Sequence, residues 1–330
     1  MIRCLARTGV IFGTLLLLFA TVSAVLWAQE EIVASLDRVE GSVEVTDAAT
    51  RRTVQGRNGL LLRMGDLVVT KDAAKATVKF RDGSEIRLFS NTSFLVEGAK
   101  ESAERDRSFK FNLFVKVGSI WANFVRQRQV AQVHTPTATM GIKGTTLRVV
   151  ERDNRARVAV TEGVVEVKND RTSVDLTAGK RLPDFTRTDE LPAKVQDIPF
   201  KLDLKSEARE LNFEGNRPAE AFLSIQLIDL KSGSNVARSG PIYLRSNYDR
   251  ITYPQAAQLD QRGFARVPLI FGPPDATHAA LDGNIYVWAL LDAESADDTG
   301  EGRYLFKFTI PPGSQRFEIE SETGEGRRRE

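Results

Sequence analysis

The stretch Ala76-Thr77-Val78-Lys79-Phe80-Arg81-Asp82-Gly83-Ser84-Glu85-Ile86-Arg87-Leu88-Phe89 decides the fold class. Two segments of alternating character flank an Asp-Gly pair, which is the strongest short-range signal for a β-hairpin. In the first segment, Val78 and Phe80 point to one face, whereas Thr77 and Lys79 point to the other. The stretch therefore predicts a hairpin with one face in a core.

The same alternation recurs on both sides of this hairpin, and Val, Ile, Thr and Phe are frequent throughout, which favours strands over helices. Further strands are expected at 43–45, 66–70, 109–117, 118–124, 147–151, 156–160, 223–227, 242–244, 264–267, 285–290 and 304–310. The chain is therefore predicted to be all-β.

One turn-and-strand unit repeats within the first half. Glu40-Gly41-Ser42-Val43-Glu44-Val45 returns as Glu162-Gly163-Val164-Val165-Glu166-Val167, and Val117-Gly118-Ser119-Ile120 is a weaker copy. Each copy predicts a glycine that needs a positive φ or a close backbone approach, followed by a strand. The uneven spacing does not fit a regular solenoid. A sandwich and a β-helix-like roll both remain open.

Three prolines among charged residues mark a boundary near the middle of the chain, at Pro183, Pro192 and Pro199. We predict a first β domain at 29–182, a Pro-containing linker at 183–200, a second β domain at 201–315 and a flexible tail at 316–330. The second domain has about six or seven expected strands, which suits an immunoglobulin-like sandwich.

The N-terminal 28 residues are predicted to be a signal peptide. Arg3 and Arg7 precede an apolar run from residue 8 to residue 28, with small residues at Ala24 and Ala28 as cleavage sites. The alternative is an uncleaved anchor, because about 21 apolar residues can span a bilayer. Both interpretations place the rest of the chain outside the cytoplasm. A cleaved signal peptide predicts a protein of the periplasm or the cell surface, and an uncleaved anchor predicts a protein of the inner membrane that faces the periplasm. Cys4, the only cysteine, lies in this segment, so no disulfide is expected.

Charge and motif content argue against several functional classes. Lys and Arg number 46 and Asp and Glu number 44, which leaves a net charge of +2 and no electrostatic signature of a nucleic-acid binder. Nothing resembles a nucleophile elbow, a metal-ligand cluster or a phosphate loop. We therefore predict a non-enzymatic protein without a metal or cofactor.

Several ordered blocks of the first domain resemble the FecR family. The blocks 41–45, 62–70 and 76–88 are similar to the opening of FecR domains, and 158–167 is similar to their close. The central block, Thr135-Pro136-Thr137-Ala138-Thr139-Met140-Gly141-Ile142-Lys143-Gly144-Thr145-Thr146-Leu147, is similar to the family signature, with Lys143 where arginine is usual. The glycines that match the family pattern, and are expected to be structural, are Gly65, Gly83, Gly141, Gly144 and Gly163.

The resemblance covers residues 38–182 and implies a FecR-type β-sandwich or β-roll in the periplasm. The best-known members relay the occupancy of an outer-membrane siderophore receptor to a cytoplasmic sigma factor, using a helical segment before the membrane span. Only about seven residues precede the apolar run here, fewer than the roughly 12 that an isolated helix needs. We therefore expect a stand-alone exported member of the family.

The central block is also the candidate ligand site. Threonine hydroxyls and the Lys143 ammonium could bind an anion or a sugar, and the glycines allow close backbone approach. The alternative is that these residues close a tight corner of the sheet. The predicted ligand-binding residues are Thr135, Thr137, Thr139, Lys143 and Thr145.

Three other groups of residues receive a structural interpretation. His134 and His278 are expected to be structural. The acidic group 292, 294, 297, 298 and 301 is expected to be a solvated loop, with calcium binding as the alternative. Trp121, Trp288 and Tyr286 are expected in the core, with sugar stacking as the alternative.

These observations lead to one functional prediction and one alternative. We predict an exported binding or sensing module that engages an envelope protein or a cell-wall glycan. The alternative is a transmembrane signalling regulator of the FecR type, anchored by an uncleaved N-terminal helix.

Overall fold

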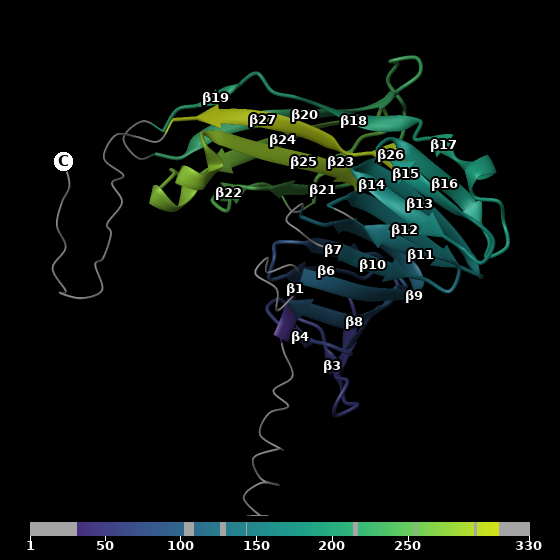
Figure 1. Ribbon diagram of the computed structural model, residues 1–330. Coiled ribbons are helices and arrows are strands. Elements are labelled where there is room, and N and C mark those ends of the chain that lie inside the picture. Colours follow the sequence, from purple (N-terminus) through teal and green to yellow (C-terminus); the bar gives the residue numbers. More distant parts are fainter. Residues whose placement is uncertain are drawn as a thin grey trace, which may run out of the picture.

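The computed structural model describes residues 32–101, 109–125, 130–142, 144–213, 217–254, 256–293 and 296–309 (Figure 1). These residues form strands joined by turns and three short 3-10 helices, so the all-β prediction is confirmed. The expected signal segment, the tail at 316–330 and Lys143 lie outside the described residues. Within those residues, no helix is long and apolar enough to span a membrane.

The first domain consists of two sheets packed face to face, here called sheets A and B. Sheet A has the order β4 (Leu61–Arg63), β1 (Ile32–Glu40), β6 (Lys75–Phe80), β7 (Glu85–Leu88), β9 (Phe109–Asn123), β12 (Thr146–Arg152), β13 (Arg155–Glu162), β16 (Lys180–Phe185) and β17 (Gln196–Asp197). Sheet B has the order β3 (Thr53–Gln55), β2 (Val43–Thr46), β5 (Leu67–Thr70), β8 (Ser93–Glu101), β9, β10 (Val130–His134), β11 (Thr139–Ile142), β14 (Val164–Lys168) and β15 (Ser173–Thr177).

The chain builds this domain by moving repeatedly from one sheet to the other. For example, β10 and β11 pair in sheet B, β12 and β13 in sheet A, and β14 and β15 in sheet B again. Apolar side chains from both sheets meet in one core, where Val78, Ile86, Leu113, Val133 and Val165 are fully buried. The domain is thus a two-layered roll, which combines the two architectures that the sequence left open.

The hairpin that decided the fold class forms as predicted. β6 and β7 are antiparallel, with Val78 opposite Ile86. Gly83 has a φ of +86°, and the Asp82 carboxylate accepts a hydrogen bond from the Ser84 backbone N–H at 2.9 Å. The turn chemistry and the alternation therefore agree at this position.

The segment 109–123, expected to form two strands, is one long strand shared by both sheets. The first half of β9 pairs with β8 and β10 in sheet B, and the second half pairs with β7 and β12 in sheet A. Gly118, at the crossing point, has a φ of +109°, and a Cβ atom there would lie 2.4 Å from Thr92 Cα. The other repeated glycines, Gly41 and Gly163, have φ values of +71° and +83°. The conformation predicted for the repeated unit is thus confirmed.

The segment expected to be a linker, 183–200, largely belongs to the first domain in the structure. β16 extends to Phe185, the 3-10 helix η1 spans Pro192–Lys194, and β17 pairs with β16. Phe185 and Leu191 are fully buried in the first core. Pro192 occupies the start of η1, where a missing N–H costs nothing, so the prolines shape a turn here.

The second domain is a sandwich of two five-stranded sheets, C and D. Sheet C has the order β22 (Ile251–Thr252), β24 (Phe264–Phe271), β20 (Ala219–Asp229), β18 (Phe200–Lys205) and β26 (Thr299–Gly300). Sheet D has the order β19 (Glu210–Leu211), β27 (Gly302–Phe308), β25 (Asn284–Leu291), β21 (Gly240–Ser246) and β23 (Gln258–Leu259). Two 3-10 helices complete the domain, η3 (Ala276–Leu281) and η4 (Ala296–Asp298). A separate apolar core lies between the two sheets, which agrees with the predicted sandwich.

Candidate functional site

The central block begins with a tight turn, residues 135–138, between β10 and β11. The Thr135 backbone N–H donates to Ala138 O at 2.8 Å. The Thr135 hydroxyl oxygen accepts hydrogen bonds from the N–H groups of Thr137 (3.1 Å) and Ala138 (3.0 Å). A threonine side chain that bonds backbone groups two and three residues ahead stabilises a turn locally. The Thr135 hydroxyl is therefore committed to holding this corner.

Thr137 fastens the same turn to a buried carboxylate. Its hydroxyl donates to Glu151 Oε1 at 2.8 Å, and Glu151 is only 1% exposed. The other carboxylate oxygen of Glu151 has no hydrogen-bond partner among the described residues. Burial raises the pKa of Glu151, although the hydroxyls of Thr135 and Thr137 act in the opposite direction. Nothing in the sequence signals this contact, because Glu151 lies on another strand.

The remaining predicted residues of the block divide between the interior and the surface. Thr145 is 1% exposed and donates to Val164 O at 3.0 Å. Thr139 is partly exposed, and its hydroxyl lies 3.1 Å from His134 Nδ1. Gly144 has a φ of +58°, whereas Gly141 has no positive φ and is an ordinary residue of β11. The ligand-binding role of the threonines in this block stays a prediction. Among them, Thr139 is the one with a partly exposed side chain.

A polar hollow of about 510 Å³ opens beside this block on the outer face of sheet B. Its lining includes Gln132, Thr135, Pro136, Thr137, Ala138, Thr139, Gly141, Glu166, Lys168, Asn169, Asp170 and Arg187. The backbone register continues from this hollow across the sheet: Thr139 is opposite His134, His134 opposite Phe114, and Phe114 opposite Leu95. The structure therefore joins the predicted block to a row of outward-facing side chains.

The outer face of sheet A is occupied by the second domain, which lies across it (Figure 1). Alternate residues of its strands point away from the first core, yet each is at most 3% exposed. This set comprises Thr77, Arg87, Phe89, Ser119, Trp121, Arg148, Val150 and Ala159. The contacting residues described below come from β21, β25 and η4 of the second domain and from residues 292, 293 and 301 beside them.

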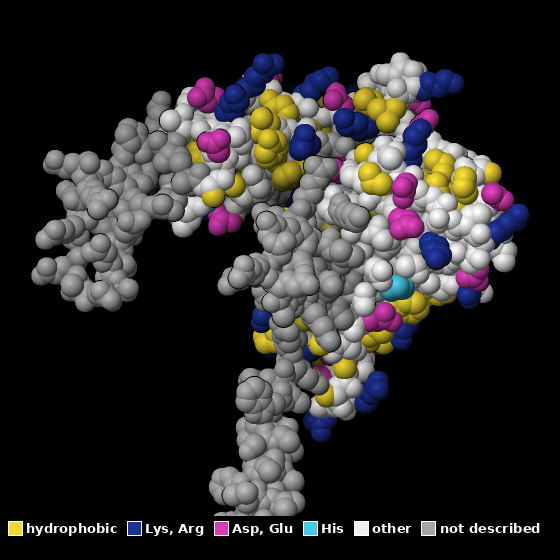
Figure 2. Space-filling model, in the orientation of Figure 1, with side chains coloured by type: hydrophobic (Ala, Val, Ile, Leu, Met, Phe, Trp, Pro, Cys, Tyr) yellow, Lys and Arg dark blue, Asp and Glu magenta, His cyan; other side chains and the backbone are white. Residues whose placement is uncertain are grey.

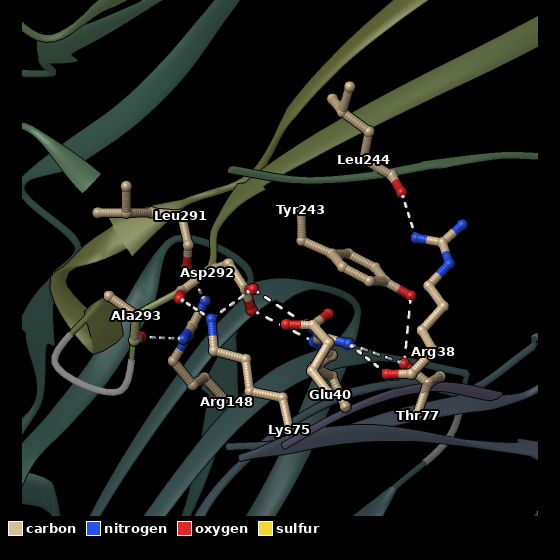
Figure 3. Close-up of polar contacts among 11 residues, drawn as sticks. Arg38, Glu40, Lys75, Thr77, Arg148, Tyr243, Leu244, Leu291, Asp292 and Ala293 are labelled. Atoms are coloured by element: carbon tan, nitrogen blue, oxygen red, sulfur yellow. Dashed lines mark hydrogen bonds and ion pairs between the residues drawn. The ribbon is translucent and has the colours of Figure 1, made fainter. Parts of the chain in front are cut away.

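Asp292 is the centre of the polar contacts at this junction (Figure 3). Its carboxylate accepts hydrogen bonds from Lys75 Nζ at 2.7 Å and from Arg87 Nη2 at 3.0 Å. Arg87 is 1% exposed and also reaches Glu40 Oε1 at 2.9 Å. Burial alone would raise the pKa of Asp292, but Arg87 and Lys75 hold it below its ordinary value. A buried carboxylate of the second domain thus binds two cations of the first, and Glu40 supplies a second negative charge.

Two further arginines of the first domain bind backbone carbonyls of the second. Arg148 donates to Leu291 O at 2.9 Å and to Ala293 O at 2.7 Å. Its full burial lowers its pKa to about 10, although Asp292 partly offsets this. Arg38 donates to Leu244 O at 2.8 Å (Figure 3). Guanidinium groups satisfy these carbonyls without a strand pairing between the domains.

An aromatic cluster completes the junction. Phe89 and Trp121 of the first domain pack with Tyr243 and Leu290 of the second. The Trp121 ring N–H donates to Glu301, whose pKa is raised by burial although Arg245 opposes the shift. Trp121 is 1% exposed, so it is a buried interface residue. By contrast, Trp288 is partly exposed beside a second hollow, of about 350 Å³, at the junction.

The acidic group of the second domain forms ion pairs instead of a solvated loop. Asp297 pairs with Arg157 at 3.0 Å and Asp298 pairs with Arg238 at 2.8 Å, in addition to the contacts of Asp292 and Glu301. Glu294 lies outside the described residues. In the described part of the chain, no three acidic, histidine or cysteine residues are grouped to hold a metal ion. Sequence reasoning noticed these carboxylates but could not identify their partners, which lie on distant strands and loops of the fold.

His278 is a structural residue, as its lack of a motif predicted. It is 5% exposed, with Nδ1 2.9 Å from Asp275 Oδ1 and Nε2 2.8 Å from Asp249 Oδ1. Its ring also packs on Tyr248, at 4.6 Å between centroids. These contacts fix the η3 corner of the second domain.

The comparison with protein families matches a stretch within residues 38–182, for which the sequence predicted the resemblance. Residues 66–166 match the family described as FecR protein. The chain contains a FecR domain. The match begins just before β5 and ends within β14, so it includes the crossing strand β9 and the whole Thr135–Thr146 block.

Two crystal structures of "a putative anti-sigma factor from Parabacteroides distasonis ATCC 8503" are similar to part of the chain, each with 17% identity. Their TM-scores are 0.32 and 0.31, and each comparison covers 39% of this chain and 57% of the other. The chain thus spans little more than half the length of that protein. No curated protein matches the chain.

Proposed function

We propose that this protein is an exported binding and sensing module whose FecR domain receives a partner on the outer face of sheet B. The observation that carries this proposal is the occupation of sheet A. Because the second domain fills the outer face of sheet A with buried ion pairs, the outer face of sheet B is the broad face of the first domain that the other described residues leave open. A FecR domain is typical of regulatory proteins, which supports a binding role over catalysis.

The open face has the composition of a protein-binding surface. Leu67, Leu95 and Phe114 are partly exposed and directly opposite one another in the register. Val117 is 43% exposed on the neighbouring row, and the polar hollow lies at the other end of the face. Protein interfaces commonly join an apolar centre to a polar rim. We therefore favour an envelope protein as the partner over a cell-wall glycan.

A variant-dependent capture experiment tests the proposal. The double variant Leu95→Ser/Phe114→Ser removes the apolar centre, and Phe222→Ser, which changes a 48% exposed phenylalanine on the second domain, is the control. Crosslinking in intact cells should recover a partner with wild type and with the control but lose it with the double variant. Equal recovery with all three proteins would contradict the proposed surface. Recovery of wall fragments in place of protein would assign the face to a glycan.

The transmembrane signalling version is a second candidate, favoured by the FecR match itself. It requires the N-terminal apolar segment to remain attached as an anchor. N-terminal sequencing of the protein isolated from cells separates the two candidates. A first residue near Val25 or Gln29 would contradict the anchored version, whereas an intact N-terminus would support it.

A further inference from the structure

A basic hollow of about 710 Å³ lies on one edge of the second domain, between the end of β18, the segment that follows it, and β27. Figure 2 shows several Lys and Arg side chains, interspersed with acidic and hydrophobic ones, along the part of the second domain where Figure 1 labels β18, β19 and β27. Its volume is in the range of small-molecule binding sites, roughly 300–1,000 Å³. Nothing in the FecR domain contributes to it.

The lining of this hollow is strongly cationic. Lys205, Arg209, Arg303 and Lys307 line it, and none of its lining residues is a carboxylate. Among the described residues, one of these four cations forms an ion pair: Lys205 pairs with Asp203 at 3.0 Å. The chain as a whole balances 46 basic residues against 44 acidic ones. Asp203 offsets only one of the four cations, so the hollow keeps a local positive potential that favours an anion.

The two walls of the hollow are fixed to each other. The Tyr304 hydroxyl donates to the carbonyls of Ser206 and Ala208, at 3.2 Å each. The Lys307 N–H donates to Arg209 O at 2.9 Å. The backbone positions that carry these cations, about one hundred residues apart in the sequence, are thus fixed relative to each other. Such preorganisation lowers the cost of binding.

Ser206 adds an independent sign of a ligand. Its side-chain oxygen is buried and has no hydrogen-bond partner among the described residues, although the residue lines the hollow. Buried hydroxyls are nearly always paired in folded proteins, so an unpaired one calls for a missing partner. A ligand oxygen in the hollow would accept this hydrogen bond once the Ser206 side chain turned toward it.

We propose that the basic hollow binds the phosphate group of an anionic ligand. Arg209 and Arg303 offer planar forks that match phosphate oxygens, and the two lysines add compact charges. Tetrahedral phosphate can use several of these donors together with the Ser206 hydroxyl. The same chemistry is offered by free phosphate compounds and by the headgroups of anionic phospholipids. This site goes beyond the proposed function, which rests on the FecR domain.

Two binding measurements on the full-length protein test the site. In the first, inorganic pyrophosphate is titrated calorimetrically into protein held in a neutral detergent. In the second, the protein is reconstituted into vesicles of neutral or of anionic phospholipid, and the protection of Lys205 from acylation is compared between them. The test variant is Arg303→Ser/Lys307→Ser. The control, Arg52→Ser/Arg57→Ser, removes two exposed cations from the first domain and the same net charge.

We expect the test variant to bind pyrophosphate at least tenfold more weakly than the control does. If the ligand is a headgroup, we expect the test variant instead to lose the protection from acylation that anionic vesicles give to the control. Ser206→Ala, which keeps every charge, should weaken the same signal several-fold. Pyrophosphate binding would identify a free phosphate compound, and protection by anionic vesicles alone would identify a headgroup. Equal weakening in test and control variants, or no signal in either measurement, would overturn the proposal while leaving the capture experiment on sheet B unaffected.

Discussion

Sheets A and B of the first domain share one core, but their outer faces differ in what covers them. In sheet A, β12 is buried at every position from Thr146 to Glu151. In sheet B, β14 alternates between exposed and buried residues from Val164 to Lys168, as expected of a sheet with one wet face. The difference shows that the second domain covers the outer face of sheet A, whereas β14 leaves alternate residues of sheet B exposed, on the face where we propose that a partner binds.

The contacts between sheet A and the second domain include buried ion pairs as well as apolar packing. The two kinds of contact contribute differently to the free energy of unfolding. Burying Arg87 and Asp292 costs desolvation free energy that their attraction must offset, so such pairs add little net stability compared with apolar residues. A mispaired arrangement, however, would leave a charge buried alone. We infer that the pairs chiefly fix the orientation of the second domain on sheet A.

The largest expected effect concerns the strand that joins the two sheets. Gly118→Ala places a Cβ 2.4 Å from Thr92 Cα at a φ of +109°, so β9 could no longer cross from sheet B to sheet A without rearrangement. We expect a loss of about 4–5 kcal/mol in the free energy of unfolding, measured by urea denaturation. Gly59→Ala is the control, because its φ is +79° but no atom lies within 4 Å. It should cost about 1–2 kcal/mol, and equal losses would contradict the steric account.

The next effect tests the partner of sheet A. Asp292→Ala leaves Arg87 buried without its main countercharge, which should cost about 3 kcal/mol and separate the unfolding of the two domains. Calorimetry should then resolve two transitions where the wild type has one. Asp203→Asn, which breaks the exposed pair with Lys205, should change stability by less than about 0.5 kcal/mol. A single unshifted transition for Asp292→Ala would show that the apolar cluster alone holds the domains together.

The pH dependence of stability should carry two opposite contributions from the same junction. The pKa of Asp292 is held below its ordinary 3.8, so its contribution is complete above that value and is lost as the pH falls through the lower folded-state pKa. The pKa of Glu301 is raised by burial above its ordinary 4.5, so its contribution is complete below that value and is lost as the pH rises through the folded-state pKa.

These two signs can be separated by denaturation at a series of pH values. Asp292→Asn should flatten the acid side of the stability profile, below about pH 4. Glu301→Gln should flatten the decline above about pH 4.5. Profiles that keep the wild-type slope in both variants would show that other groups determine the pH response.

The sequence predicted the inner faces of both sheets better than their outer faces. The alternation around Val78 and the Asp-Gly turn follow from local chemistry, so the hairpin could be predicted. The repeated glycines could be predicted because a positive φ favours glycine whatever the distant contacts. The role of Asp292 could not, since its partners Lys75 and Arg87 are more than two hundred residues away. Alternation alone also cannot show whether an outward residue such as Arg148 meets water or another domain.

The smallest expected effect compares two valines that both point away from the shared core. Val150 on sheet A is 2% exposed, whereas Val164 on sheet B is 45% exposed. Replacing either with threonine keeps the shape and β-branching but adds a hydroxyl. At Val150 the hydroxyl would be buried under the second domain, at a cost of about 1–2 kcal/mol. At Val164 it would face water, and the change should stay within about 0.5 kcal/mol. Urea denaturation of the two variants measures the contrast directly, because the substitution is the same and only the outer layer differs. Similar losses would mean that sheet B is covered as sheet A is, and the open face proposed for the partner would have to be abandoned.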